Sequence, residues 1–284
     1  MQISVKAYAK INWALDITGR LENGYHEMDM LMQNVDLTDE ITLSDARFTS
    51  LTIGDKPAAN MEKNLIYRAV KALSDYTGEK RNVKITLVKR IPVRAGMGGG
   101  SADCASTLLA LNEMWKLKLP VKTLMDIGLK LGADVPYCTA GGFCRVRGIG
   151  EKVESIQNAP EKFIVITIVG DGLSTQAVFS DFDNLNDGAL NLKIPAVQKA
   201  LTEWDTEMLN EYGGNALERA AIRQIPEIEG RIKEFYLLGA KYARMSGSGS
   251  CVYGVFDTEN EAKACAEKLP GAIVTQTLSL PSRI

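Results

Sequence analysis

The chain has 284 residues, a formal net charge of -2 and a sequence pI near 5.7. This charge argues against a general nucleic-acid-binding protein, because affinity for a phosphate backbone depends on surplus lysine and arginine. Hydrophobic residues form 45% and charged residues 24% of the chain, which is typical of a globular protein with one large or two medium domains.

Membrane insertion and protein-held metal chemistry are both disfavoured by the sequence. Apolar runs such as 163–169 are far shorter than the roughly 20 residues that span a bilayer, and residues 1–16 lack the pattern of a secretory signal. The five cysteines form no C-x-x-C pair, and the chain contains one histidine. We therefore expect a cytoplasmic protein with buried, reduced thiols and no metal site built from its own side chains.

The first 55 residues predict mainly strands. Alternating and β-branched residues indicate strands over 3–11 and 11–17, the polar segment 22–27 predicts a turn, and alternation returns over 39–53. A helix is predicted over 64–78, and its apolar face is formed by Leu65, Ala69, Ala72, Leu73 and Tyr76.

A strand over 82–92 leads into a glycine-rich segment and a second helix. This helix is expected to begin near Ser101, because apolar residues recur at helical spacing at Cys104, Leu108, Leu111 and Trp115.

A third helix is predicted over 121–132 and a hairpin over 141–156. Between them, Pro136 biases Val135 away from helical conformation.

The pattern of strands and helices restarts in the second half of the chain. We expect a buried strand over 161–169 and helical segments over 195–225 and 227–238, followed by a strand pair at 241–256, a helix at 259–268 and a strand at 272–279. The polar segment near 155–160 suggests two domains, 1–157 and 158–284.

The glycine-rich segment predicts an anion-binding loop. Gly96, Gly98, Gly99 and Gly100 allow positive φ angles, and the following helix adds unpaired N–H groups and partial positive charge at its N-terminus. The alternative is a flexible loop or a packing turn. Two features favour phosphate binding. Three basic residues, Lys89, Arg90 and Arg94, lie just upstream of the glycines. The hydroxyl of Ser101, just downstream, can bind a phosphate oxygen or a magnesium ion.

The pattern around this loop excludes two common nucleotide-binding motifs. Ser101 stands five residues after Gly96, where the Walker motif has a glycine-lysine pair and the dinucleotide fingerprint has its third glycine. A second loop of small residues, 245–250, is consistent with either phosphate binding or a tight turn.

Phosphoryl transfer needs a carboxylate to accept a proton and a cation to neutralise charge. Lys10, in a strand of small and apolar residues, and Asp134, between a glycine and a proline, are the candidates. The alternatives are a solvent-exposed edge-strand lysine and a turn residue. With His26 as the single histidine and no G-x-S-x-G motif, a Ser-His-Asp hydrolase is unattractive.

Six motifs in order along the chain together resemble the GHMP small-molecule kinases. They are AKIN at 9–12, GYH at 24–26, NLI at 64–66, IPVRAGMGGGSADCAS at 91–106, GADVP at 132–136 and GSGS at 247–250. The resemblance implies a two-domain α+β fold, with an N-terminal half like the second domain of ribosomal protein S5 and a C-terminal ferredoxin-like α/β layer. The active site would lie in the cleft between them.

The resemblance also implies ATP-dependent phosphorylation of a hydroxyl group, with Mg²⁺ neutralising the triphosphate. Asp134 matches the base of the family, Lys10 its companion cation, and Asn12 a residue that holds the acceptor. Asn64 matches an adenine contact. The triphosphate would be wrapped by the loop of Val93, Arg94, Ala95, Gly96, Met97, Gly98, Gly99, Gly100 and Ser101.

On the acceptor side, the motifs resemble those of a family member that acts in isoprenoid precursor biosynthesis and whose substrate carries a cytidine. Tyr25 and Phe179 match aromatic residues that sandwich the base, His26 matches a reader of its edge, and Thr175 matches a further substrate contact. The rivals are a kinase for homoserine, mevalonate or a sugar, and a non-enzymatic nucleotide-binding protein on the same scaffold. We expect a small-molecule partner and a monomer or weak homodimer.

The glycine-rich loop departs from the pattern of the family at several positions. Arg94 stands where a small residue is usual, Ala102 replaces a common second serine, and Cys104 replaces a common alanine. Arg94 would either crowd the loop or add a phosphate contact.

Overall fold

The computed structural model describes residues 1–185 and 190–280. Its strands are β1 (Gln2–Arg20), β2 (His26–Asp45), β3 (Ser50–Ile53), β4 (Lys56–Pro57), β5 (Val83–Val88), β6 (Phe143–Gly148), β7 (Lys152–Ser155), β8 (Phe163–Ile168), β9 (Tyr242–Met245), β10 (Cys251–Phe256) and β11 (Ile273–Leu278). Its helices are α1 (Leu65–Thr77), α2 (Gly99–Met114), α3 (Val121–Leu129), α4 (Val135–Ala140), α5 (Thr175–Leu185), α6 (Ile194–Glu203), α7 (Thr206–Tyr212), α8 (Glu218–Gln224), α9 (Glu227–Leu237) and α10 (Glu259–Ala266).

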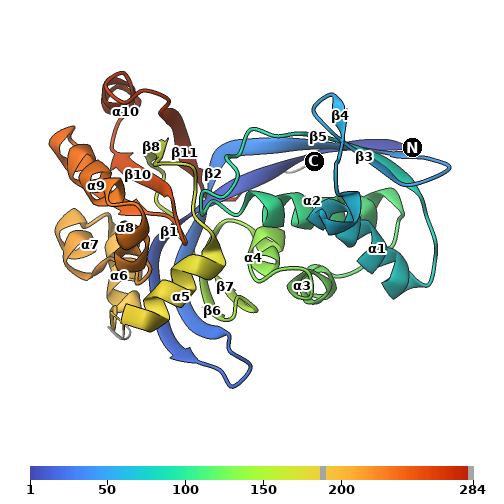
Figure 1. Ribbon diagram of the computed structural model, residues 1–284, viewed down its shortest axis with the longest axis horizontal. Coiled ribbons are helices and arrows are strands. Elements are labelled where there is room, and N and C mark those ends of the chain that lie inside the picture. Colours follow the sequence, from blue (N-terminus) through green and yellow to red (C-terminus); the bar gives the residue numbers. More distant parts are fainter. Residues whose placement is uncertain (186–189, 281–284) are drawn as a thin grey trace.

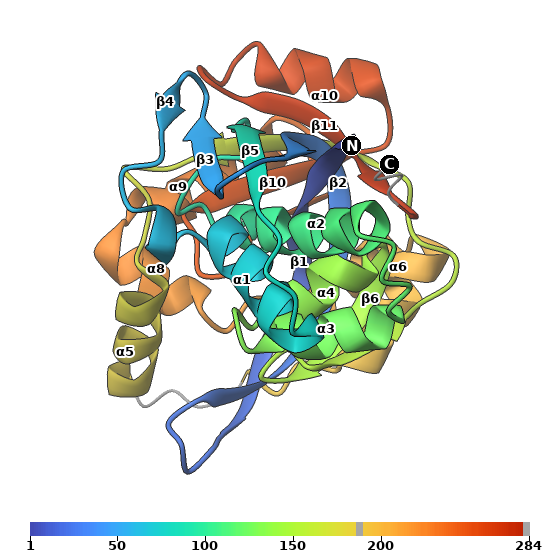
Figure 2. The same ribbon diagram turned by 90° about the vertical axis from the view of Figure 1, so that its right-hand side faces the viewer.

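The strands join into one continuous sheet in the order β4-β3-β5-β2-β11-β8-β10-β9, while β1 and β6 also pair with β2, and β7 pairs with β6. Helices α6 to α10 gather at one end of the molecule and α1 to α3 at the other, with the β1–β2 hairpin running between them (Figure 1). In the second view, the loop that joins β1 and β2 projects away from the body of the molecule (Figure 2). Strand β2 therefore links the two halves.

The first hairpin is longer than the sequence predicts. The segments 3–11 and 11–17 form a single strand of 19 residues, and β2 has 20 residues that begin at His26. Residues 30–35 are buried on both faces of β2, so they lack the alternation that marks a half-exposed strand. The antiparallel register shifts between Tyr8 and Lys10 and again after Asn12, which are irregularities that re-aim side chains.

Helix α1 confirms the predicted boundaries and most of the predicted face, since Ala69 and Leu73 are buried and Leu65 and Ala72 pack partly buried against the core. Asn64 caps it by accepting from the N–H of Ile66 at 2.9 Å, and Gly78 ends it in the left-handed conformation. The buried residues are Ile66, Ala69, Val70 and Leu73. Tyr76, the second-last residue of the helix, is 56% exposed and is the one residue of the predicted face that lies at the surface.

Helix α2 is buried on nearly all sides, with every residue from 102 to 108 inside. It packs against β1, α1 and α4. The helix begins at Gly99, close to the predicted start near Ser101.

The expectation for Val135 is wrong. Val135 opens helix α4, and Pro136 occupies the first turn, where its missing N–H has no intrahelical partner to lose. The proline therefore starts the helix instead of preventing it. The hairpin predicted over 141–156 is confirmed as β6 and β7.

The helical segment predicted over 195–225 is divided into α6, α7 and α8. Trp204 ends α6 in the left-handed conformation, and Asp205 then caps α7 by accepting from the N–H of Met208 at 2.9 Å. The glycine pair 213–214 separates α7 from α8. The remaining predicted elements match β8, α9, β9, β10, α10 and β11 within a few residues.

The core confirms the predicted state of the cysteines, since all five are free and buried. Burial raises the pKa of the Cys251 thiol to about 12. Within the part of the chain that the structure describes, no helix has the length and apolar character needed to cross a bilayer. The division into domains at 157/158 stays a prediction.

Close packing of α9 on β10 depends on Gly254. A Cβ on Gly254 would lie 2.4 Å from the ring of Phe235 on α9. Gly230, which is also on α9, has open space around it. We expect Gly254→Ala to lower the free energy of unfolding by about 1–3 kcal/mol, because the ring of Phe235 must move. The matched change Gly230→Ala should leave stability unchanged or raise it by up to about 1 kcal/mol. Equal urea midpoints for the two variants would contradict this packing.

Candidate active site

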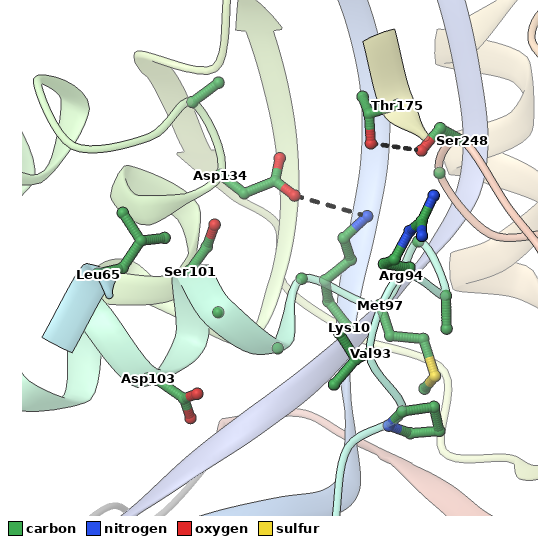
Figure 3. A pocket seen from close by; sticks show the side chains of 18 of the residues that line it. Lys10, Leu65, Val93, Arg94, Met97, Ser101, Asp103, Asp134, Thr175 and Ser248 are labelled. Carbon is green, nitrogen blue, oxygen red and sulfur yellow. Dashed lines mark hydrogen bonds and ion pairs between the residues drawn. The ribbon is translucent and has the colours of Figure 1, made fainter. Parts of the chain in front are cut away.

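A cavity of about 640 Å³ lies between the two halves of the molecule. It is lined by the N-termini of α2 and α4, strand β1, the start of α5 and the loop after β9 (Figure 3). The predicted site residues that line it are Lys10, Asn12, Asn64, Val93, Arg94, Ala95, Gly96, Met97, Gly98, Gly99, Gly100, Ser101, Asp134, Thr175 and Phe179. The structure therefore gathers most of the sequence-predicted residues around one space.

Lys10 is a buried cation fixed in the wall of this cavity. Its side chain is 4% exposed, and its ammonium donates to Asn12 Oδ1 at 2.6 Å and lies 3.8 Å from Asp134 Oδ2. The backbone N–H of Lys10 donates to the carbonyl of Met97 in the glycine-rich loop. The alternative of a solvent-exposed lysine is thus excluded, because the side chain is buried and its ammonium contacts Asn12 and Asp134.

Asp134 faces Lys10 from the other side of the cavity and precedes α4 (Figure 3). Its side chain is 32% exposed and makes no hydrogen bond to the end of the helix. The neighbouring Ala133 is held by close backbone approach of Gly150, whose Cβ would fall 2.2 Å from the Ala133 carbonyl oxygen. The carboxylate is therefore rigidly supported, yet open to a molecule in the cavity.

The glycine-rich loop presents an uncapped helix N-terminus to the same space. Gly98 is the N-cap of α2 with φ 69°, and no side chain caps the helix. Gly96 and Gly98 have positive φ, but Gly99 and Gly100 are helical, contrary to expectation. A Cβ on Gly98 would lie 3.2 Å from Lys10 Cγ, so glycine here preserves room beside the ammonium. Unpaired N–H groups and the positive end of a helix dipole are features that favour the binding of an anion.

The two loops of small residues touch each other. A Cβ on Gly96 would lie 2.0 Å from the carbonyl oxygen of Ser246, and Ser246 Oγ donates to the Gly96 carbonyl at 3.2 Å. Ser246 Oγ also accepts from the N–H of Asn12 at 3.3 Å. Ser248, two residues on, lines the cavity. The loop 245–250 thus forms part of the site and braces the glycine-rich loop.

A buried cluster of charges lies beneath the glycine-rich loop. Lys89 Nζ contacts Asp39 Oδ2 at 2.5 Å and Asp103 Oδ2 at 3.0 Å, and Asp39 Oδ1 accepts from the backbone N–H groups of Arg90 and Ile91. Burial raises the pKa of Asp103 to about 7; Lys89 opposes this shift and Asp39 adds to it. The other oxygen of Asp103 is buried without a partner in the described residues.

Arg90 does not belong to the cavity wall. Its guanidinium pairs with Glu40 at 2.9 Å on the surface. Of the three basic residues next to the glycines, Lys89 and Arg94 line the cavity.

Of the four residues expected to bind the acceptor beyond Asn12, Thr175 and Phe179 line the cavity, whereas Tyr25 and His26 do not. Phe179, on α5, stacks on the ring of His26 with centroids 4.8 Å apart, and His26 Nε2 lies 2.7 Å from Asp183 Oδ1. Tyr25 is 58% exposed on the preceding turn and does not line the cavity. Thr175 Oγ1 is hydrogen-bonded to Ser248 Oγ at 2.9 Å. The roles assigned to these residues in substrate binding stay predictions.

The comparisons with known proteins agree with this geometry. Residues 64–142 match the model of the GHMP kinases N terminal domain, and residues 195–274 match the GHMP kinases C terminal model. A 4-diphosphocytidyl-2-C-methyl-D-erythritol kinase of Alkaliphilus metalliredigens is 38% identical over 273 residues, which cover 94% of this chain and 92% of the relative. The chain belongs to the GHMP kinases. The ATP-dependent phosphoryl transfer of this family to a small molecule explains why a cation, a carboxylate and an anion-binding loop converge here.

Other GHMP kinases extend the match. The 4-diphosphocytidyl-2-C-methyl-D-erythritol kinase of Lachnoclostridium phytofermentans is 39% identical over 264 residues, which cover 92% of this chain and 90% of the relative. A crystal structure of 4-(cytidine 5'-diphospho)-2C-methyl-D-erythritol kinase superimposes with a TM-score of 0.82 at 30% identity, over 97% of this chain and 99% of that one. The two-domain GHMP kinase fold is therefore confirmed.

Several residues of the GHMP kinase site escaped the sequence analysis. Asn215, just before α8, donates its amide to the carbonyls of Met245 and Gly247 at 2.9 and 2.8 Å, and so holds the second loop. The glycine pair just before Asn215 is the one feature of the sequence that marks this segment. Asp39 and Asp103 gave none, because their partner Lys89 is 50 and 14 residues away.

The contact between the two loops can be tested at Gly96. Gly96→Ala should lower the free energy of unfolding by about 2–4 kcal/mol, since the new Cβ both strains a φ of +72° and overlaps the backbone of Ser246. Gly271 has a similar φ of +76° with open space around it, so Gly271→Ala isolates the cost of the backbone conformation, about 1 kcal/mol. Thermal unfolding with equal losses in both variants would show that the loops do not touch.

The cluster under the loop predicts a pH dependence. Because the folded protein retains a proton on Asp103 that the unfolded chain has lost, stability should fall as pH rises from about 4 to about 7. In Asp103→Asn this component disappears, so wild-type stability relative to the variant should drop by about 1–3 kcal/mol between pH 4.5 and 7.5.

Urea unfolding at several pH values measures this difference. The control Asp126→Asn removes an exposed carboxylate paired with Lys122 and should run parallel to wild type. Parallel curves for Asp103→Asn as well would refute the raised pKa of Asp103.

Proposed function

We propose that this chain is a kinase that transfers the γ-phosphoryl group of ATP to the 2-hydroxyl of 4-diphosphocytidyl-2-C-methyl-D-erythritol, in non-mevalonate isoprenoid precursor biosynthesis. The single observation that carries the chemistry is the buried Lys10 ammonium, 3.8 Å from Asp134 and beside the uncapped N-terminus of α2. The choice of acceptor is supported by relatives at 34–39% identity along nearly the full chain that bear this kinase name.

In this mechanism Asp134 accepts the proton of the acceptor hydroxyl as the hydroxyl oxygen bonds to the γ-phosphorus. The bond between the γ-phosphorus and the β,γ-bridging oxygen of ATP breaks, and ADP leaves with the electron pair of that bond. Lys10 orients Asp134, and its positive charge stabilises the negative charge that develops on the phosphoryl oxygens. Asn12 keeps the ammonium in place through the 2.6 Å hydrogen bond. The partial exposure of Asp134 gives the acceptor direct access to the base.

ATP is placed along the α2 side of the cavity. The free N–H groups of Gly98 to Ser101 would bind its phosphates, and Asn64 would contact adenine, with the Nδ2 of its side chain available because its Oδ1 caps α1. Apolar side chains at this end, including Ile53, Leu65 and Leu87, suit a planar base.

Mg²⁺ is compatible with the residues present. It prefers oxygen ligands and uses few protein groups when phosphates supply the rest. The Ser101 hydroxyl, at the first turn of α2, is a suitable protein oxygen, and the described residues hold no cluster of three or more acidic, histidine or cysteine side chains. The bound ion would neutralise the triphosphate.

The rival acceptors within the family remain specific alternatives. Solved homoserine and mevalonate kinases superimpose at 14–19% identity, which reflects the common fold alone. The cytoplasmic location and the monomeric or weakly dimeric state expected from the sequence stay predictions.

The decisive experiment is ADP release by the purified protein with Mg-ATP and each acceptor in turn: the cytidine-linked erythritol, homoserine, mevalonate and galactose. We expect turnover with the first alone. Selective turnover of another acceptor would overturn the substrate, and absence of turnover with all four would favour a binding protein.

Asp134→Asn tests the proposed base in the same assay. It should reduce kcat by at least about 10²-fold while leaving KM within about tenfold, because the proton is transferred only in the transition state. A variant with wild-type kcat would exclude Asp134 as the base.

A further inference from the structure

Arg94 stands out in the glycine-rich loop because its backbone conformation is one that glycine adopts most easily. Its φ is +59°, in the left-handed region, where a side chain is unfavourable. Its carbonyl accepts from the N–H of Leu173 at 3.3 Å, and Gly172 approaches so closely that a Cβ there would lie 2.8 Å from that carbonyl oxygen. The surroundings impose the conformation, so a glycine would fit position 94 without strain.

The side chain of Arg94 is a cation that the protein leaves unpaired. It lines the cavity and is exposed to it, and no carboxylate among the described residues lies within ion-pair distance. The other basic residues of this region are neutralised, since Lys89 contacts Asp39 and Asp103 while Lys10 contacts Asp134. A free guanidinium in a cavity fits a ligand with a multiply charged oxyanion.

The position of Arg94 separates it from the ATP side. In Figure 3 the α2 N-terminus with Ser101 lies on one side of Lys10, and Arg94 lies on the other, with its guanidinium directed toward Ser248 and Thr175. Ser248 and Thr175 share a hydrogen bond at the start of α5, four residues before Phe179. The guanidinium therefore faces the half of the cavity that leads to the expected acceptor end.

We propose that Arg94 is a specificity-determining residue whose guanidinium binds the diphosphate group of the phosphoryl acceptor, beside the hydroxyls of Thr175 and Ser248. This inference rests on the proposed function, which supplies an acceptor with a diphosphate. It gives the unusual residue in the loop a role on the acceptor side and leaves the triphosphate of ATP to the N-terminus of α2.

The test compares Arg94→Gly, Arg94→Lys and the matched control Arg90→Ala. Glycine suits the φ of +59°, so Arg94→Gly removes the charge without adding strain and should fold at least as stably as wild type. Arg90 lies in the same segment but pairs with Glu40 outside the cavity, so its variant should keep wild-type constants.

The readouts are the dissociation constants of CDP and of cytidine, measured by calorimetry with the ATP site saturated by a non-hydrolysable ATP analogue, and KM for both substrates. For Arg94→Gly we expect CDP binding and KM for the acceptor to weaken by about 10-fold to 100-fold, the size of a charge-assisted contact. Cytidine binding and KM for ATP should change by less than about threefold. Arg94→Lys should restore part of the loss, because it keeps the charge without the bidentate geometry.

Three results would overturn the proposal: equal CDP affinity in wild type and Arg94→Gly, a rise in KM for ATP alone, or a fall in kcat with KM unchanged. The second would place Arg94 on the ATP phosphates, and the third on the transferred phosphoryl group. If wild type itself bound no CDP and turned over only another acceptor, the proposed function would fail with it. If wild type bound CDP and the variant bound it equally, the role of Arg94 alone would fail.

Discussion

A buried ammonium is costly unless it is paired, and this requirement at Lys10 shapes the whole site. Asn12, on β1, accepts a hydrogen bond from the ammonium, and Asp134, just before α4, forms an ion pair with it. The backbone of Lys10 is fixed at the same time by the carbonyl of Met97. A strand, a helix and the glycine-rich loop are thereby held at one point, and all three line the same cavity.

The second constraint is the close approach of two backbones. The carbonyl of Ser246 occupies the space where a Cβ on Gly96 would lie, so the glycine-rich loop is braced by a segment 150 residues later. Asn215 holds that later segment in place by donating hydrogen bonds to two of its carbonyls. Pre-formed geometry of this kind reduces the ordering cost of binding and keeps the reacting groups aligned.

The parts of the site that the sequence predicted are those encoded by short motifs. The residue types mark the glycine-rich loop and make Lys10 and Asp134 candidates, the resemblance to the family assigns them roles, and all of them line the cavity. The missed features depend on contacts distant in sequence. The middle of β2 was not predicted because it is buried on both faces, and the pairing of Asp39 with Lys89 spans 50 residues. The ring partner of Phe179 is likewise set by tertiary packing, which brings His26 onto it while Tyr25 remains exposed.

The hydrogen bonds between β2 and β11 have a consequence for the time at which the site forms. Val35 pairs with Thr277, and Asn34 pairs with Leu278. Strand β2 is made early in synthesis, but this part of it gains its β11 partner only after one of the last described segments has been made. Contacts of such long sequence separation form slowly, because loop-closure entropy must be overcome first. During synthesis the motifs of the first half are therefore made well before the loop 245–250 that lines the same cavity, and the strand that pairs with β2 follows later still.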